Sequence, residues 1–214
     1  LSSGKGIDRE RHALALEHLV ANRGRKGKVA RTVMTSHFVD AVAKSHGLET
    51  RETPVGFKYI GELLRSGHYL IGGEESGGLS IQGHVPDKDG ILACLLMLEL
   101  AAVEKKPLSA VRDRLFKRVG GFHSVRLNYK MDRLREMVEL QERLRVKPPL
   151  ELAGGSVWRI DESDGFKFIL RDGSWLGLRP SGTEPAFRVY VEAHDPKRLD
   201  ALVEAGKKML KGKF

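Results

Sequence analysis

The apolar and polar positions of the chain follow two different patterns, one after the other. In the first part, short β-rich runs alternate with stretches that have the apolar spacing of helices. Strands that alternate with helices predict a three-layer α/β domain with a parallel or mixed sheet and right-handed crossovers. The predicted strands cover residues 28–35, 48–55 and 69–76, and the predicted helices cover residues 11–22, 36–47, 56–67, 86–106 and 109–120.

The pattern changes after Gly120 and Gly121. Strands then follow one another in a meander joined by tight Asp-Gly turns, with helices at both ends of the segment. This order predicts a smaller α+β domain with an antiparallel sheet and flanking helices, so we expect two domains, at residues 1–120 and 121–214. The strands expected in the second domain cover residues 122–130, 155–163, 166–172, 174–180 and 186–193, and the helices cover residues 131–145 and 196–210.

The predicted helix at residues 86–106 is the most apolar, and we expect it to be buried. It contains Cys94, the only cysteine of the chain, which we expect to fill space in the core. A single cysteine excludes a disulfide within the chain and favours a reducing compartment, the cytoplasm. The histidines lack the spacing of metal ligands, so His12, His18 and His68 are expected at the surface or at helix ends.

The composition is that of a soluble globular protein, with 41% hydrophobic and 30% charged residues among 214. The longest apolar run, at residues 91–98, is too short to span a membrane, and no signal peptide is visible. The net charge of +9 attracts anions, from nucleic acids to phosphorylated metabolites. Aromatic residues make up 7% and do not interleave with the basic ones, so we expect neither a nucleic acid nor a membrane as partner.

A glycine-rich loop follows the third predicted strand, at residues 72–78. Ligands of parallel sheets bind at the carboxyl ends of the strands, and glycines let a backbone come close to a ligand. Glu74, Glu75 and Ser76 supply acceptors and a hydroxyl, which suit the hydroxyl groups of a sugar. A divalent metal ion or a polar turn without a ligand are the alternatives, and Lys88 in the next loop could reach a ligand held here.

A second polar loop joins the last two predicted strands, at residues 179–185. The hydroxyls of Ser181 and Thr183 and the backbone N–H groups around Gly182 can form an anion-binding concavity. Arg179 and Arg188 can add charge-assisted hydrogen bonds to phosphate oxygens. The alternative is a hairpin turn in which these residues serve only the geometry.

Four motifs in this order resemble the α-D-phosphohexomutase superfamily, and within it the bacterial phosphoglucomutase branch. The resemblance covers the chain from about residue 12 to its end and implies domains 3 and 4 of a four-domain enzyme, the last of them TBP-like. The motifs are TPVGFKYIGELL at residues 53–64, GGEESGG at 72–78, DKDGILACLLMLEL at 87–100 and RPSGTEPAFRVYVEA at 179–193.

The family's sugar-binding loop, Gly-Glu-x-Ser-Gly, falls on residues 73–77. The resemblance therefore implies that Gly73, Glu74 and Ser76 bind sugar, and that Lys58 of the Pro-x-Gly-Phe-Lys segment contacts the substrate. Phosphomannomutases commonly carry methionine before the serine of this loop and histidine two residues after it. This chain has Glu75 and Gly78 there, which favours glucose over mannose.

The family's phosphate loop falls on Arg179, Ser181, Gly182 and Thr183. Arg188 occupies a position where relatives of this branch often carry a phosphate-binding arginine. The family moves a phosphoryl group between O1 and O6 of glucose, through glucose 1,6-bisphosphate. The loop would grip the phosphate that is not reacting and so fix the sugar in line with the phosphoryl donor.

The family's phosphoserine motif and its Mg²⁺-binding motif, which belong to domains 1 and 2, do not occur in this sequence. We therefore expect the chain to be inactive alone, with a hexose phosphate and domains 1 and 2 of the same enzyme as partners, and with Mg²⁺ bound by those domains. Another phosphohexomutase, such as a phosphomannomutase, and a non-catalytic sugar-phosphate-binding protein are the alternatives.

Overall fold

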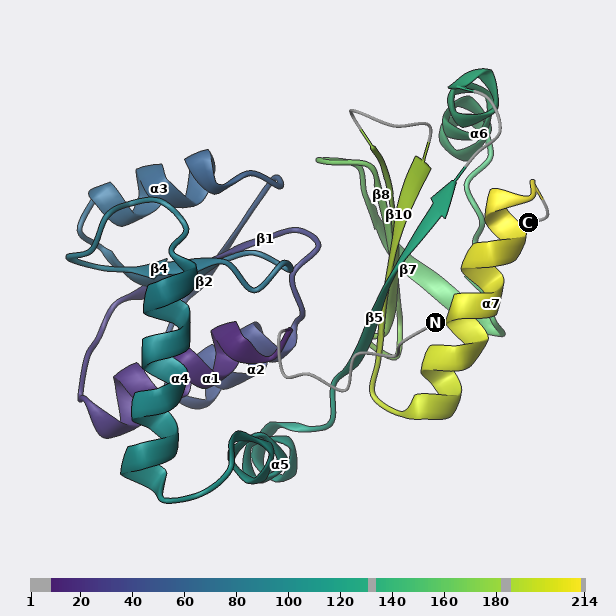
Figure 1. The fold of residues 1–214 in the computed structure, drawn as a ribbon. Coiled ribbons are helices and arrows are strands. Elements are labelled where there is room, and N and C mark those ends of the chain that lie inside the picture. Colours follow the sequence, from purple (N-terminus) through teal and green to yellow (C-terminus); the bar gives the residue numbers. More distant parts are fainter. Residues whose placement is uncertain (1–8, 131–133, 182–185, 213–214) are drawn as a thin grey trace. The chain divides into compact units, whose positions relative to one another are not determined.

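The computed structural model describes residues 9–130, 134–181 and 186–212. The chain divides into two compact units, Leu1–Gly120 (unit 1) and Gly121–Phe214 (unit 2). Each unit contains one β-sheet with its own helices (Figure 1). Among the residues that the structure describes, no helix is both long and apolar enough to cross a membrane.

Unit 1 is an α/β domain with three layers, as the sequence predicts. Its sheet has the strand order β2-β1-β3-β4, with β1 parallel to β2 and β3, and β4 antiparallel to β3. Helix α3 covers one face of the sheet, and α1 and α2 cover the other (Figure 1). In chain order the elements are α1 (Arg11–Glu17), the π-helical turn η1 (His18–Asn22), β1 (Lys28–Thr32), α2 (Phe38–Ser45), β2 (Thr50–Thr53), α3 (Phe57–Arg65), β3 (Tyr69–Gly73), β4 (Leu79–Ile81), α4 (Gly90–Glu104) and α5 (Leu108–Val119).

Strand β4 is absent from the sequence-based prediction. It has three residues, a length at which an alternating pattern cannot be recognised. Its pairing with β3 makes the sheet mixed and holds both ends of the glycine-rich loop between them. The end of β3 therefore becomes the base of a closed turn.

Helix α4 begins at a well-formed cap, because the Asp89 carboxylate accepts hydrogen bonds from the N–H groups of Ile91 (2.8 Å) and Leu92 (3.0 Å). The prediction that this helix is buried is wrong for one of its two sides. Cys94 is exposed instead of filling the core, and Leu98 is 67% exposed. The helix is apolar around its whole circumference, so its sequence could not show which side faces the sheet.

His12 and His18 lie at helix ends, one of the two predicted alternatives, but neither is at the surface, because both side chains are buried. The two ring nitrogens of His12 have no hydrogen-bond partner within the described ranges. Burial, helped by the positive charge of Arg31, lowers the pKa of His12 to about 3. Arg31 is itself buried and forms ion pairs with Asp40 (2.6 Å) and Glu52 (2.5 Å).

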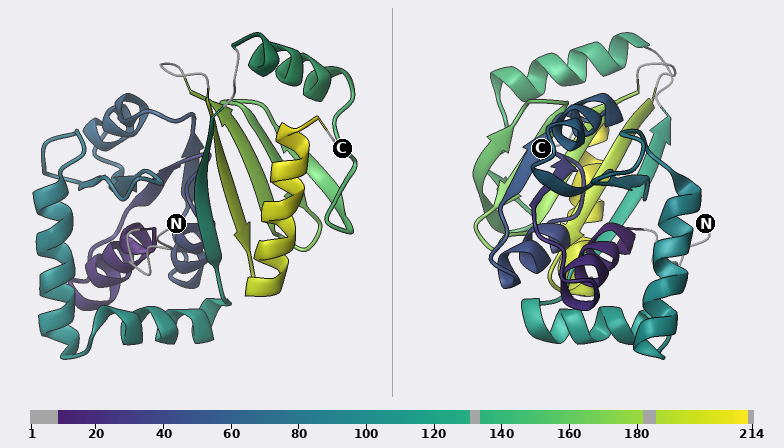
Figure 2. Two further views of the ribbon diagram at one scale, coloured as in Figure 1. Left: turned by 45° about the vertical axis from the view of Figure 1, so that its right-hand side comes forward. Right: turned by 90° about the vertical axis from the view of Figure 1, so that its left-hand side faces the viewer.

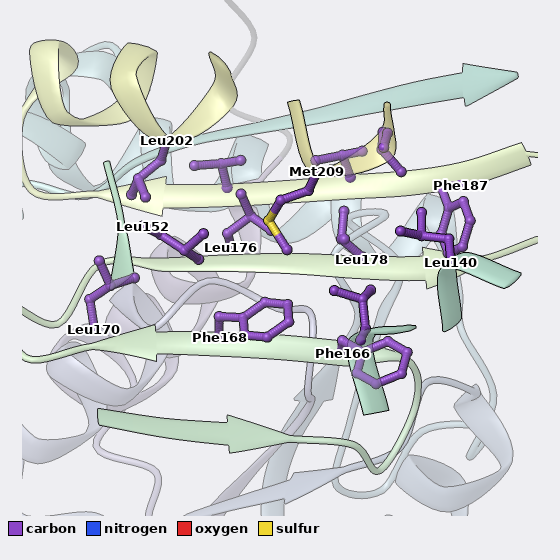
Figure 3. Close-up of a cluster of buried hydrophobic side chains, with 14 of the residues drawn as sticks. Leu140, Leu152, Phe166, Phe168, Leu170, Leu176, Leu178, Phe187, Leu202 and Met209 are labelled. Atoms are coloured by element: carbon purple, nitrogen blue, oxygen red, sulfur yellow. The ribbon is translucent and has the colours of Figure 1, made fainter. Parts of the chain in front are cut away.

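Unit 2 is an antiparallel sheet with the strand order β5-β10-β9-β8-β7-β6. Helix α7 runs along one face of this sheet (Figure 2), and its Leu202 and Met209 reach the side chains of the central strands (Figure 3). Helix α6 adds Leu140 to the same core. The elements are β5 (His123–Lys130), α6 (Leu134–Val146), β6 (Glu151–Leu152), β7 (Gly155–Asp161), β8 (Phe166–Leu170), β9 (Trp175–Pro180), β10 (Ala186–Ala193) and α7 (Pro196–Leu210).

The core of unit 2 supplies a first test of the fold. Phe168 is fully buried between the sheet and the helices, and its replacement in Phe168→Ala should lower the free energy of unfolding by about 3–5 kcal/mol. Trp158→Ala is the control, since Trp158 is 62% exposed, and it should change stability by less than about 1 kcal/mol. Urea unfolding followed by tryptophan fluorescence measures both, since Trp175 remains in each variant. Equal effects of the two substitutions would contradict the packing.

Burial of neutral His12 predicts acid sensitivity of unit 1. Unfolded histidine takes up a proton near pH 6.5, but the native side chain does so only near pH 3. Above pH 6.5 His12 is neutral in both states and does not oppose folding. Below that pH the unfolded state binds the proton more tightly, so the free energy of unfolding falls by up to about 1.4 kcal/mol per pH unit. His12→Leu should reduce the loss between pH 6.5 and 4.5.

The measurement is urea unfolding at several pH values, followed by NMR signals of β1. The matched control is His68→Leu, because His68 is exposed, and it should keep the pH dependence of the wild type. A His12→Leu variant with the wild-type slope would show that His12 is not held neutral.

Candidate functional site

The glycine-rich loop of unit 1 forms a tight turn at the carboxyl ends of the parallel strands β1 and β3. The N–H of Glu74 donates to the carbonyl oxygen of Gly78 (2.9 Å), and the N–H of Gly77 donates to the carbonyl oxygen of Glu74 (3.0 Å). Gly77 has a φ of +83°, a conformation that other residues rarely adopt. The loop therefore lies where ligands of parallel sheets bind, as the sequence predicts.

Glu74 is the most buried polar side chain of this loop, with 7% of its surface exposed. Lys88 reaches it from the loop between β4 and α4, with Nζ 3.6 Å from Oε2, and is itself 59% exposed. Loss of solvation raises the pKa of Glu74, while the charge of Lys88 opposes that rise. A carboxylate held beside an exposed amine can accept from one hydroxyl group while the lysine donates to another.

The segment that precedes α3 meets the same carboxylate. The backbone N–H of Gly56, which has a φ of +136°, donates a hydrogen bond to Glu74. This contact brings the Pro-x-Gly-Phe-Lys motif next to the loop. The order of the motifs along the chain did not show that the two are neighbours. The amine of Lys58, two residues further on, lies 4.8 Å from the centre of the Tyr59 ring, and the side chain is exposed. Lys58 thus lies on the segment that contacts Glu74 through Gly56, while its own amine lies over the ring of Tyr59.

The remaining residues of the loop differ in their surroundings. Ser76 is exposed at the tip. Glu75 accepts a hydrogen bond of 3.3 Å from the hydroxyl of Thr32, which lies 2.8 Å from the hydroxyl of Thr35. Both threonines are buried; Thr32 is the last residue of β1 and Thr35 follows it, and no motif in the sequence pointed to them.

Gly73 cannot carry a side chain, because a Cβ there would lie 2.7 Å from Nδ1 of His12. The ring of His12 thus packs directly against the backbone at the base of the loop. Sequence reasoning missed this contact, since His12 and Gly73 are far apart in the chain and histidine at a helix start is usually exposed.

The described residues do not fit a metal ion. None of their His, Cys, Asp and Glu side chains form a group of three or more that could hold one. Glu74 already faces the positive charge of Lys88, and Glu75 is bound to Thr32. The described residues therefore give no support to the divalent-metal interpretation of residues 72–78.

Unit 2 brings the predicted phosphate-binding residues to one end of its sheet. The N–H of Ser181 donates to the carbonyl oxygen of Ala186 (2.7 Å), which closes the loop between β9 and β10. Arg179 and Arg188 are directly opposite each other on these two strands. Gly182 and Thr183, which the sequence also predicts to bind phosphate, lie outside the described residues.

The pairing of Arg179 with Arg188 is unusual for a sheet. Directly opposite residues have Cβ atoms about 5 Å apart, and like charges in such a pair are destabilising. Asp164, in the turn between β7 and β8, offsets one of the charges through an ion pair of 3.0 Å with Nε of Arg179. Two guanidinium groups beside one carboxylate leave an excess of positive charge, which suits an anion.

Comparison with known proteins identifies the family. The family model of phosphoglucomutase/phosphomannomutase α/β/α domain III matches residues 10–119, and that of the C-terminal domain of the same family matches residues 127–207. The chain is 36% identical over 194 residues to the "Probable phosphomannomutase" of Haemophilus influenzae, and 33% identical over 211 residues to the phosphoglucomutase of Komagataeibacter xylinus. These matches cover 85% and 89% of the chain but 39% and 38% of the two relatives.

A crystal structure from Thermus thermophilus, described as that of a phosphomannomutase, has the same fold. It superposes with a TM-score of 0.75 at 30% identity, over 96% of this chain and 40% of that one. The chain thus spans about two fifths of the length of its relatives. It belongs to the phosphoglucomutase/phosphomannomutase family of the α-D-phosphohexomutase superfamily, and corresponds to domain III and the C-terminal domain.

Proposed function

We propose that the chain is the substrate-recognition part of a phosphoglucomutase, an enzyme that interconverts glucose 1-phosphate and glucose 6-phosphate through glucose 1,6-bisphosphate. The observation that carries the proposal is the buried carboxylate of Glu74, held beside Lys88 and the Gly56 N–H in the loop that matches the family's sugar-binding motif. A buried carboxylate costs free energy unless its hydrogen bonds are satisfied, and sugar hydroxyl groups supply the missing donors.

In this proposal each unit recognises its own part of the ligand. In unit 1, Glu74 accepts from a sugar hydroxyl, Ser76 and the Gly73 backbone lie beside it, and Lys88 and Lys58 donate to oxygens. In unit 2, Arg179, Arg188 and Ser181, with Gly182 and Thr183 of the same loop, bind the phosphate that is not transferred. Fixing both groups positions the sugar for in-line phosphoryl transfer.

Glucose is favoured over mannose by the residues around the serine of the sugar loop. Glu75 and Gly78 stand where phosphomannomutases commonly have methionine and histidine. Gly78 is in close contact with Lys88, since a Cβ there would lie 3.2 Å from Cδ of that lysine. A phosphomannomutase remains the second candidate, because relatives named for either sugar match this chain.

The phosphoryl donor and the Mg²⁺ ion belong to the region that the relatives have beyond the part matched here. That assignment is supported by the two-fifths coverage of the relatives. The location in the cytoplasm stays a prediction from the sequence. A non-catalytic protein that binds sugar phosphates would share the same site and differ only in the absence of turnover.

Amide NMR titrations test the recognition of sugar and phosphate. Glucose 1-phosphate should shift signals of residues 73–77 in unit 1 and of Arg179 to Ser181 in unit 2, and inorganic phosphate should shift only the second set. Arg179→Met should weaken both ligands about tenfold or more, because a charge-assisted hydrogen bond is lost. Glu74→Gln should weaken only the sugar phosphate, also about tenfold.

The matched controls are Arg171→Met, at the other end of the sheet of unit 2, and Glu62→Gln on the exposed side of α3. Neither should change an affinity. Equal responses to both ligands at every position would reduce the site to an anion site, and no shift at residues 73–77 would contradict sugar recognition by unit 1.

A separate prediction concerns turnover. The 214-residue chain alone should not convert glucose 1-phosphate into glucose 6-phosphate, since it lacks the phosphoserine motif. A coupled assay of glucose 6-phosphate formation, with the Glu74→Gln variant purified in parallel, distinguishes true activity from a contaminant. Turnover by the wild type that the variant lacks would disprove the prediction.

A further inference from the structure

One side of α4 presents a continuous apolar surface to solvent. It consists of Ile91, Cys94, Leu95 and Leu98, joined by Val85 of the preceding loop, and we call it the α4 face. The exposed fractions are 75% for Ile91, 57% for Leu95, 67% for Leu98 and 64% for Val85, and Cys94 is exposed as well. Isolated exposed apolar residues are ordinary, but a contiguous group of this kind marks a site of interaction.

The spacing of these residues shows that they form one stripe. The helical residues of the α4 face lie at positions i, i+3, i+4 and i+7, so they share one side of the helix. The opposite side, which includes Leu96 and Leu100, is buried, and α4 packs there against α1 and β4 (Figure 2). A helix that is apolar on all sides is normally buried on all sides.

A hollow lies beside the α4 face, at the start of the helix. It has a volume of about 710 Å³ and is lined by Val85, Ile91, Cys94 and Leu95 on the apolar side and by residues 87–90 on the polar side. Lys88 belongs to this lining, and its amine lies 3.6 Å from the carboxylate of Glu74. A body that covers the α4 face and fills this hollow would therefore contact Lys88, the ion-pair partner of Glu74.

We propose that the α4 face is the docking surface for the region of a phosphohexomutase that precedes domain III, whether that region is part of the same polypeptide or a separate one. The inference rests on the proposed function. The relatives carry more than half of their length outside the part matched here, so they contain a body large enough to cover the face. A mostly apolar surface suits a permanent contact.

The position of the α4 face favours this occupant over a second copy of the chain. The region that supplies the phosphoryl donor must come close to the sugar, and Lys88, which pairs with Glu74, lines the hollow beside the α4 face. A second copy would bring no phosphoserine motif to this place, because the sequence contains none.

Cys94 provides a probe at the centre of the face without any substitution. The rate of its alkylation by a maleimide is measured in the 214-residue chain alone and after addition of the N-terminal region of the Haemophilus influenzae relative. The labelled peptide is quantified by mass spectrometry, and circular dichroism first confirms that the added region is folded. Docking should slow alkylation about tenfold or more, because an interface core excludes water and reagents.

Leu98→Lys tests the contact itself. Lysine has nearly the helix propensity of leucine, and Leu98 is 67% exposed, so the isolated chain should fold as before. A charge buried in the interface should weaken binding of the added region about tenfold or more and restore fast alkylation. Val146→Lys is the control, since Val146 is 84% exposed and lies on unit 2, and it should change neither quantity.

The same measurements are made on a fusion in which the added region precedes residue 9 of this chain. Protection of Cys94 in either arrangement, lost in Leu98→Lys, supports the proposal. Fast alkylation in both arrangements would overturn it. Protection that instead rises with the concentration of the chain alone would also overturn it, in favour of a second copy.

Failure of the docking surface and failure of the proposed function give different results. If glucose 1-phosphate shifts the signals of residues 73–77 but Cys94 stays reactive, the sugar site stands and the docking surface is wrong. If Cys94 is protected but glucose 1-phosphate binds no better than inorganic phosphate, the docking surface stands and the proposed function is wrong.

Discussion

The burial of the Glu74 carboxylate is the constraint on which the candidate sugar site depends. A carboxylate that is 7% exposed needs donors, and the structure provides them from two directions, the backbone of Gly56 and the amine of Lys88. These contacts join three segments that are separate in sequence into one site. The antiparallel pairing of β4 with β3 fixes the turn that presents the carboxylate, and His12 packs against its base at Gly73. The sugar recognition proposed for unit 1 thus depends on how a small mixed sheet ends.

Much of this arrangement could be predicted from local signals in the sequence. The glycines around Glu74 and Glu75 predicted an irregular loop at the end of a strand, and the alternation of strands and helices predicted the type of domain. The features that the sequence did not predict depend on tertiary contacts. The hydrogen bond from Gly56, the ion pair of Arg179 with Asp164 and the burial of His12 join residues whose proximity no periodic pattern shows. The loop residues Gly182 and Thr183 lie outside the described ranges, so their role stays a prediction.

Helix α4 shows where hydrophobicity alone misleads. Its sequence predicted burial, and one side is indeed buried, but Cys94 and Leu98 face solvent. The error is informative, because the pattern of a helix reflects all of its neighbours in the working protein. An apolar stripe that is exposed in a chain two fifths as long as its relatives points to a neighbour that the relatives contain. The same reasoning links the two proposals, since that neighbour would border Lys88 and thereby Glu74.

Calorimetric titration with two bisphosphates tests the central claim most directly. Glucose 1,6-bisphosphate and hexane-1,6-diol bisphosphate carry the same two phosphates, but only the first has ring hydroxyl groups for Glu74 to bind. Sugar recognition by the chain predicts that the glucose compound binds about tenfold more tightly, and that Glu74→Gln removes this difference. Equal affinities of the two compounds for the wild type would contradict the account, because the chain would then recognise phosphate alone.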